Sequence, residues 1–167
     1  MAAQPADGKG KETDETMKIK YIFCLLFFGF CSISVFPQIA GKIESLLNTE
    51  AVNYEQTVQI ILEAADVMAS PGLQEAFSFA SDKGWLPKKA ETGNPVKLGG
   101  VALLIMQAFD IKGGIFYTLF QNERYAYREL ISQGIIHGRS DPDMSVSGEF
   151  LLSIIGQILS RREAGVL

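Results

Sequence analysis

Apolar residues recur at three- and four-residue intervals over most of the chain after residue 40, which is the period of an amphipathic helix. Residues 54–69 (YEQTVQIILEAADVMA) show this period first, with apolar side chains on one face and acidic side chains elsewhere. Ser70-Pro71 follows, and this pair predicts an N-cap and a proline at the first position of the next helix. Gly84 stands where a glycine commonly ends such a helix, so a second helix is expected between them.

The second half of the chain continues the helical pattern. Residues 101–109 (VALLIMQAF) are apolar almost all round, which predicts the most buried helix of the domain. Gly113-Gly114 ends it, and a brief apolar segment at 115–120 precedes a helix expected over 123–133, with Tyr127, Leu130 and Ile131 facing inward. A last apolar helix begins near Phe150. No stretch shows a sustained period of two, so the predicted fold class is all-α.

The first forty residues have a different character. Residues 1–16 are polar and of low complexity, which predicts a disordered extension, or a start codon assigned upstream of the true one at Met17. Residues 17–20 are cationic, and residues 21–36 are sixteen uncharged, mostly apolar residues, so 17–40 has the pattern of a secretory signal. An uncleaved membrane anchor is the alternative, although a span needs about 20 apolar residues. A lipoprotein modified at Cys31 is a further alternative, but its signal requires a small residue at the position that Phe30 occupies.

Composition narrows the classes of function. The formal net charge of −4 and the pI near 5.0 argue against nucleic acid as a partner, because such proteins usually carry a basic face. Cys24 and Cys31, the two cysteines, both lie inside the apolar segment. A mature domain of residues 41–167 therefore has no disulfide, no thiol nucleophile and no cysteine metal site.

The second half of the domain repeats the pattern of the first. Residues 83–109 align with 133–159 when one gap is allowed, so that Gly84 falls on Gly134, Gly99 on Gly148 and Val101 on Phe150. Each unit has a helix, a glycine, an apolar pair, a polar loop and a second apolar helix. Two helix–loop–helix units, at about 73–111 and 123–161, are predicted from this internal repeat.

The second unit resembles the S-layer homology domain. That family has a helix ending in Gly-Ile-Ile/Val, a loop with Pro-Asp/Asn, and Ile-Thr-Arg-Ala-Glu-Phe opening the next helix. Matching segments here are Gly134-Ile135-Ile136, Asp141-Pro142-Asp143 and Ser147–Phe150, while the first unit keeps Gly84-Trp85-Leu86 and Asn94-Pro95. The resemblance implies helical repeats in an exported envelope protein that binds cell-wall polysaccharide. The family's arginine is missing here, a third repeat is not found, and the helix before Ala69 stays unassigned.

Asp141-Pro142-Asp143 is the segment whose side chains most suggest a metal. Oxygen ligands at alternate positions are typical of a calcium loop, but such a loop needs glycine at its sixth position and an acid at its twelfth. Val146 and Leu152 stand there, so the segment is interpreted as a connector, with Asp141, Asp143 and Glu149 as structural residues. His137, the single histidine, has no nucleophile or orienting group at motif spacing. The sequence predicts no catalytic residues, no metal and no cofactor.

Arg124 and Arg128 are four residues apart and therefore share a helix face, with Tyr125 beside them. Arginine forks next to an aromatic ring can hold an anionic sugar, so Arg124, Tyr125, Arg128 and the loop residue Arg139 form the candidate ligand site. A solvated helix face is the alternative. Trp85 is expected to fill the core between the two units.

The sequence thus predicts a non-enzymatic, exported module of the periplasm or cell surface. Its expected partner is a wall or envelope polysaccharide or an envelope protein, with the membrane contacted only through the N-terminal segment. The alternative is a protein-interaction or structural helical domain, without glycan binding, held by an uncleaved signal segment.

Overall fold

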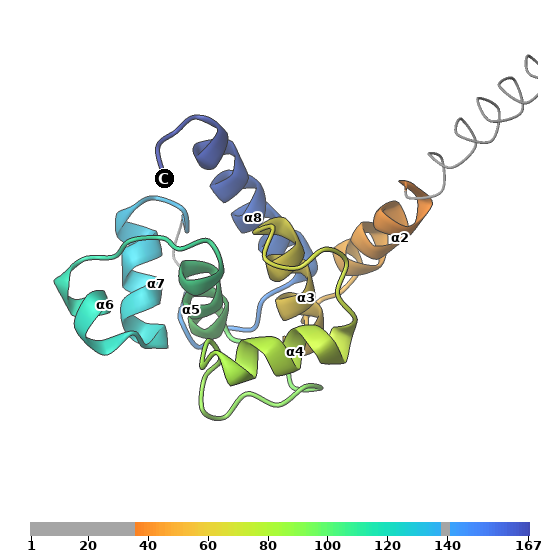
Figure 1. Cartoon of the computed structure of the whole chain (residues 1–167), viewed down its shortest axis with the longest axis horizontal. Helices are drawn as coiled ribbons and strands as arrows, with labels where there is room; N and C mark the ends of the chain where they lie inside the picture. Colours follow the sequence, from red (N-terminus) through yellow and green to blue (C-terminus); the bar gives the residue numbers. More distant parts are fainter. Residues whose placement is uncertain (1–35, 138–140) are drawn as a thin grey trace, which may run out of the picture. The chain divides into compact units, whose positions relative to one another are not determined.

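Seven helices make up the part of the chain that the structure describes, which is residues 36–137 and 141–167 of a computed structural model (Figure 1). No strand occurs among these residues, which confirms the all-α class. The helices are α2 (Phe36–Leu47), α3 (Tyr54–Ala64), α4 (Leu73–Asp82), α5 (Leu98–Ala108), α6 (Ile115–Phe120), α7 (Glu123–Ser132) and α8 (Gly148–Glu163).

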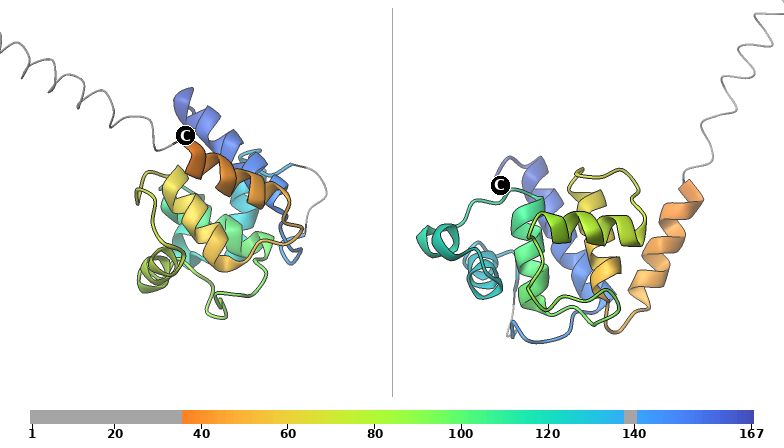
Figure 2. Two further views of the ribbon diagram at one scale, coloured as in Figure 1. Left: turned by 90° about the vertical axis from the view of Figure 1, so that its right-hand side faces the viewer. Right: turned by 60° about the horizontal axis from the view of Figure 1, so that its bottom comes forward.

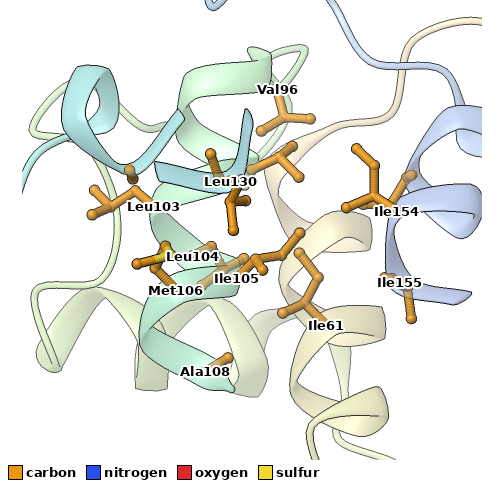
Figure 3. Close-up of a cluster of buried hydrophobic side chains, with 14 of the residues drawn as sticks. Ile61, Val96, Leu103, Leu104, Ile105, Met106, Ala108, Leu130, Ile154 and Ile155 are labelled. Carbon is orange, nitrogen blue, oxygen red and sulfur yellow. The ribbon is translucent and has the colours of Figure 1, made fainter. Parts of the chain in front are cut away.

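Helix α5 is at the centre of the unit formed by Glu44–Leu167, between α7 on one side and α3 on the other (Figures 1 and 3). Ten of its eleven residues are buried, which confirms that this is the most buried helix of the described chain. Its neighbours contribute Ile61 from α3, Leu130 from α7 and Ile154 from α8 to the same core. An all-round apolar helix needs partners on every side, and here it has them.

Three buried valines join the loops of the domain through a closed cycle of backbone hydrogen bonds. The amide of Val52 donates to the carbonyl of Val146 at 2.9 Å, Val146 donates to Val96 at 3.3 Å, and Val96 donates to Val52 at 2.8 Å. Each valine lies two residues before the first residue of a helix, namely α3, α5 or α8. We call these three residues the valine cycle.

The valine cycle relates three helix–loop–helix units, where the sequence alignment found two. In each unit an outer helix (α2, α4 or α7) leads through a loop to an inner helix (α3, α5 or α8). Outer helix α4 packs on inner helix α3, α7 packs on α5, and Leu46 in the last turn of α2 lies against Gly148 at the start of α8. The helix that the sequence left unassigned is therefore the inner helix of the first unit (Figure 2).

The alignment register predicted for the two later units is wrong by one residue beyond the loop. The valine cycle pairs Val96 with Val146, which are 50 residues apart, as are Gly84 and Gly134. No gap is needed. Every buried residue of α8 then falls on a buried residue of α5, with Ile154 on Leu104, whereas the gapped alignment placed buried Ile158 on the half-buried Phe109.

Two other predictions fail around the first helices. Helix α3 ends at Ala64 rather than Ala69, because the amides of Val67 and Met68 both turn back to the carbonyl of Leu62. Ser70 is not an N-cap: its φ of 48° is left-handed, whereas a cap residue is extended. Gly72 takes that place, its amide bonded to the Glu75 carboxylate at 3.4 Å.

Helix α7 begins at Glu123 as predicted, and Tyr127 and Leu130 are buried. Ile131 is not: 39% of it is exposed, because it lies on the edge of the buried face.

The predicted disordered extension (1–16) and most of the predicted signal or anchor (17–40) lie outside the described residues. The predicted boundary at Ala40–Gly41 falls within helix α2. Across residues 36–137 and 141–167, no helix is both long enough and apolar enough to span a membrane.

Candidate binding surface at helix α6

Helix α6 is an insertion between the second and third units, and it folds back onto α7. Gln121 makes the reversal with a left-handed backbone (φ 36°, ψ 52°), and the side chain of Asn122 then caps α7 by accepting from the amide of Tyr125 at 3.1 Å. In Figure 1 and in the right-hand view of Figure 2, α6 lies at the edge of the unit beside α7.

Hydrogen bonds and the buried ring of Tyr117 fix α6 to the rest of the domain. Tyr117 is buried, and its hydroxyl accepts a hydrogen bond from Nε2 of Gln107 in α5 at 3.0 Å. Burial raises the pKa of Tyr117, while the bond from Gln107 opposes that rise. The amide of Gly114 donates to a carboxylate oxygen of Glu129 at 2.9 Å. Gly113 leaves room for the Tyr117 ring, since a Cβ there would lie 2.5 Å from a ring carbon.

The outward side of α6 exposes four large apolar side chains. Their exposed fractions are 78% for Ile115, 62% for Phe116, 70% for Leu119 and 57% for Phe120. The Tyr125 ring stacks on Phe116 at 5.9 Å and on Phe120 at 5.4 Å between ring centroids, with interplanar angles of 12° and 23°. We call these five residues the α6 patch. The stacked rings make the patch an ordered surface rather than loose side chains.

Hollows flank the patch on two sides. One of about 150 Å³ is lined by Ile115, Phe116, Tyr125 and Arg128, among others. Another of about 690 Å³ lies on the far side of Phe120, where Leu86 and Leu103 form its apolar wall and Lys88 and Lys89 its cationic rim.

The structure brings together three of the four residues predicted to bind a ligand. Arg128 lines the smaller hollow beside Tyr125, and Arg124 is exposed one turn before it on α7. Arg139, the fourth, lies outside the described residues. What sequence reasoning missed is α6 itself. An apolar run normally predicts a buried element. The signal that pointed to exposure was its length: the run has only six residues, between Gly113-Gly114 and Gln121-Asn122, and so short a helix is unlike one that is buried on all sides.

The residues predicted to be structural lie at turns and helix ends. Gly84 and Gly134 both have left-handed φ angles, 69° and 65°. The residues that follow them, Trp85 and Ile135, donate their amides back to Ala80 and Leu130, which completes the same helix stop in both units. Trp85 is half-buried at the edge of the core and meets the Phe79 ring edge-on at 5.7 Å.

The Asp141-Pro142-Asp143 loop closes onto the start of α5. The Asp141 carboxylate accepts from the amide of Asp143 at 2.8 Å, forming a turn. The carbonyl of Pro142 accepts from Gly99, one of the first amides of α5, at 2.8 Å. Asp143 also pairs with Lys97 at 2.9 Å, and this bond is the main cause of the raised pKa of Lys97. The loop thus uses its oxygens to cap a neighbouring helix.

Glu149 is exposed in the first turn of α8, where Ser147 is the cap and accepts from the amide of Phe150 at 3.2 Å. Within residues 36–137 and 141–167, no group of three His, Cys, Asp or Glu side chains is placed to hold a metal ion.

Comparison with protein-family models finds no family that matches this chain, and comparison with curated proteins and with solved structures finds no match either.

Proposed function

We propose that this domain is a non-catalytic attachment module of the cell envelope, similar to S-layer homology domains, which binds its partner through the α6 patch. The observation that carries this proposal is the patch itself: four large apolar side chains are held outward by a buried tyrosine and a three-ring stack. Soluble domains seldom expose such a contiguous apolar surface unless it binds something.

The arrangement of units supports the resemblance in one respect. The family's module usually has three repeats, and the valine cycle joins three helix–loop–helix units. Each valine stands where the isoleucine of Ile-Thr-Arg-Ala-Glu would fall, and the N-cap residues Asn53, Lys97 and Ser147 stand where the threonine would fall. Of these three, the side chains of Asn53 and Ser147 accept a hydrogen bond from the first turn of their helix.

The same register weakens the glycan version of the proposal. The family's arginine would fall on Tyr54, Leu98 or Gly148, none of which is cationic, and Glu149 falls on the alanine. A polysaccharide would therefore need a different site, and Arg124 and Arg128 beside Tyr125 are the only pair that the predicted site supplies among the described residues. We therefore assign the contact surface to the α6 patch rather than to the helix starts.

Retention by separated envelope fractions tests this proposal. Purified wall, washed membranes and an envelope-protein fraction are each incubated at low salt with residues 41–167. The control is Val166→Ser, which alters a side chain 71% exposed outside the patch, much like Leu119 at 70%. We expect at least one fraction to retain the domain and the control, and the double variant Ile115→Ser/Leu119→Ser to lose retention. If a wall glycan is the partner, Arg124→Ala/Arg128→Ala should also weaken retention by wall. Retention by no fraction would overturn the proposal.

A further inference from the structure

Within the proposed attachment function, on which the membrane assignment below rests, the composition and shape of the α6 patch favour a lipid bilayer as the partner. Aromatic side chains bury about 150–250 Å² each. At exposures between 57% and 78%, the four outward side chains of α6 present on the order of 500 Å² of apolar surface. A stable protein interface buries about 800 Å² on each partner, so the patch by itself is small for a dimer.

Cations surround the patch although the protein as a whole is acidic. Lys88 and Lys89 rim the hollow beside Phe120, and Arg128 lines the hollow beside Phe116, with Arg124 on the same face of α7. The acids in these two hollows are Glu123 and Glu129, and Glu129 is occupied by the amide of Gly114 and the side chain of Gln133. The two hollows are therefore lined by three cations and two acids, and Arg124 adds a fourth cation one turn before Arg128, whereas the chain carries a net charge of −4.

Charge and shape separate a bilayer from the other occupants. Two copies pairing through α6 would bring the same cations face to face, which disfavours a second copy. A partner helix would need a groove to lie in, whereas α6 is a ridge with a hollow on either side. A ridge of Ile, Phe and Leu with Lys and Arg on its flanks is the composition of helices that lie in the interface of anionic membranes.

The N-terminal sequence gives the domain a second means of reaching a membrane. Residues 21–36 are uncharged and mostly apolar, and the last of them, Phe36, is the first residue of helix α2. Where this segment is retained as an anchor, it keeps the domain at high effective concentration near the bilayer, so that a weak contact through α6 is enough.

We infer that the α6 patch docks on a lipid bilayer with anionic headgroups, with Ile115, Phe116, Leu119 and Phe120 entering the boundary between headgroups and acyl chains and Lys88, Lys89, Arg124 and Arg128 facing the phosphates.

Vesicle sedimentation with residues 41–167 tests this inference without the apolar segment, which would bind vesicles by itself. Among the residues whose burial the structure describes, every core residue lies between Leu46 and Ile158, within the unit Glu44–Leu167, so this shorter chain keeps that core. Far-UV circular dichroism checks the fold of each variant. The probes are vesicles of phosphatidylcholine alone and of phosphatidylcholine with phosphatidylglycerol, both at low salt.

We expect binding to the phosphatidylglycerol vesicles. Ile115→Ser/Leu119→Ser should lower the partition coefficient at least about tenfold, since each side chain is highly exposed and makes no ring stack. Val166→Ser should leave it unchanged. Arg124→Gln/Arg128→Gln should lower binding to the anionic vesicles by about fivefold for each cation removed, and added salt should have the same effect.

Three results would overturn the inference: a folded domain that does not sediment with anionic vesicles, sedimentation that the double serine variant does not change, or a concentration-dependent dimer in light scattering that this variant abolishes. Retention by wall or by envelope protein in the absence of vesicle binding would leave the attachment function standing with a different partner. If neither vesicles nor any envelope fraction retains the domain, both the attachment function and the membrane inference are wrong.

Discussion

Thr57 shows how much a single residue can depart from the pattern of its unit. It lies five residues after Val52, as Val101 and Leu151 lie five residues after the other two members of the valine cycle. All three positions are buried, but the Thr57 hydroxyl has no hydrogen-bond partner in the structure. A buried hydroxyl without a partner costs stability because it has lost its water.

We predict that Thr57→Val raises the free energy of unfolding by about 1 kcal/mol, since valine has the same shape and no polar group to desolvate. Urea unfolding of residues 41–167 measures the change. The control is Thr118→Val on α6, where the hydroxyl is exposed and donates to the carbonyl of Gly114 at 3.1 Å. That variant should gain nothing. A loss of stability in Thr57→Val would mean that a buried water bonds the hydroxyl.

Tyr54 and Tyr117 make the domain sensitive to alkaline pH. Burial raises the pKa of both above the ordinary value of 10.0, with the nearby Glu123 adding to the effect at Tyr54. The folded state thus favours the neutral phenols. Their contribution to stability is complete below pH 10.0 and is lost as the pH rises from there through the higher folded-state pKa.

Unfolding midpoints measured between pH 8 and pH 11.5 should therefore fall above about pH 10. Lys97, whose pKa is also raised, loses its charge in the same range, so the tyrosine contribution is obtained by difference. Tyr54→Phe/Tyr117→Phe should flatten the profile compared with the parent domain. A double variant with an unchanged profile would contradict the assignment.

At the scale of elements, periodicity predicted the helices whose burial pattern is simple. Helices α5 and α7 lie within three residues of their predicted limits, because a strongly apolar run and a clear amphipathic stripe determine them. The start of α4 was missed because Ser-Pro is a good cap only with an extended backbone, and the fold gives Ser70 a left-handed one. The first unit was missed because the loop between α2 and α3 has neither the glycine stop nor the length of the loops in the other two units.

The part of the candidate site that lies on α7 was also predictable from the sequence. Helical spacing placed Arg124, Tyr125 and Arg128 on adjacent parts of one helix, as the structure has them. The shortness of the apolar run indicated that one side of α6 would be exposed, but the run itself does not say which of its side chains the rest of the fold covers. Only Tyr117 turns inward, and that depends on its contact with Gln107.

The start of α8 depends on a glycine for a reason other than flexibility. An added Cβ at Gly148 would lie 1.8 Å from the carbonyl oxygen of Leu46, and the Gly148 amide donates to Thr49 at 2.9 Å. Gly148→Ala should therefore lower the free energy of unfolding by roughly 3 kcal/mol, as expected when backbone must move to admit an atom. Gly156 offers a matched control in the same helix, since a Cβ there meets nothing within 4 Å.

Gly156→Ala should raise stability by about 0.5–1 kcal/mol through helix propensity. Thermal unfolding of the two single variants separates the two effects. Equal and small changes at both positions would mean that Leu46 does not approach α8 as closely as the structure shows.

At the scale of the whole molecule, the three units close on one another instead of stacking in a row. In a linear array each repeat contacts only its neighbours, so the ends can unfold separately. Here the valine cycle makes every unit a neighbour of both others, and the loop of the third unit caps the inner helix of the second through Pro142 and Gly99. The single core, from Leu46 to Ile158, draws on all three units.

This closure predicts that residues 41–167 unfold in a single cooperative transition. Trp85, the only tryptophan, follows the second unit by fluorescence, while far-UV circular dichroism follows all helices. The two midpoints in urea should coincide. Thr57→Val lies in the first unit, yet it should shift the Trp85 midpoint as much as the dichroism midpoint, because a change in one unit stabilises a shared core. A Trp85 transition that stays in place while the dichroism shifts would mean that the first unit unfolds on its own, and that the valine cycle does not couple the three.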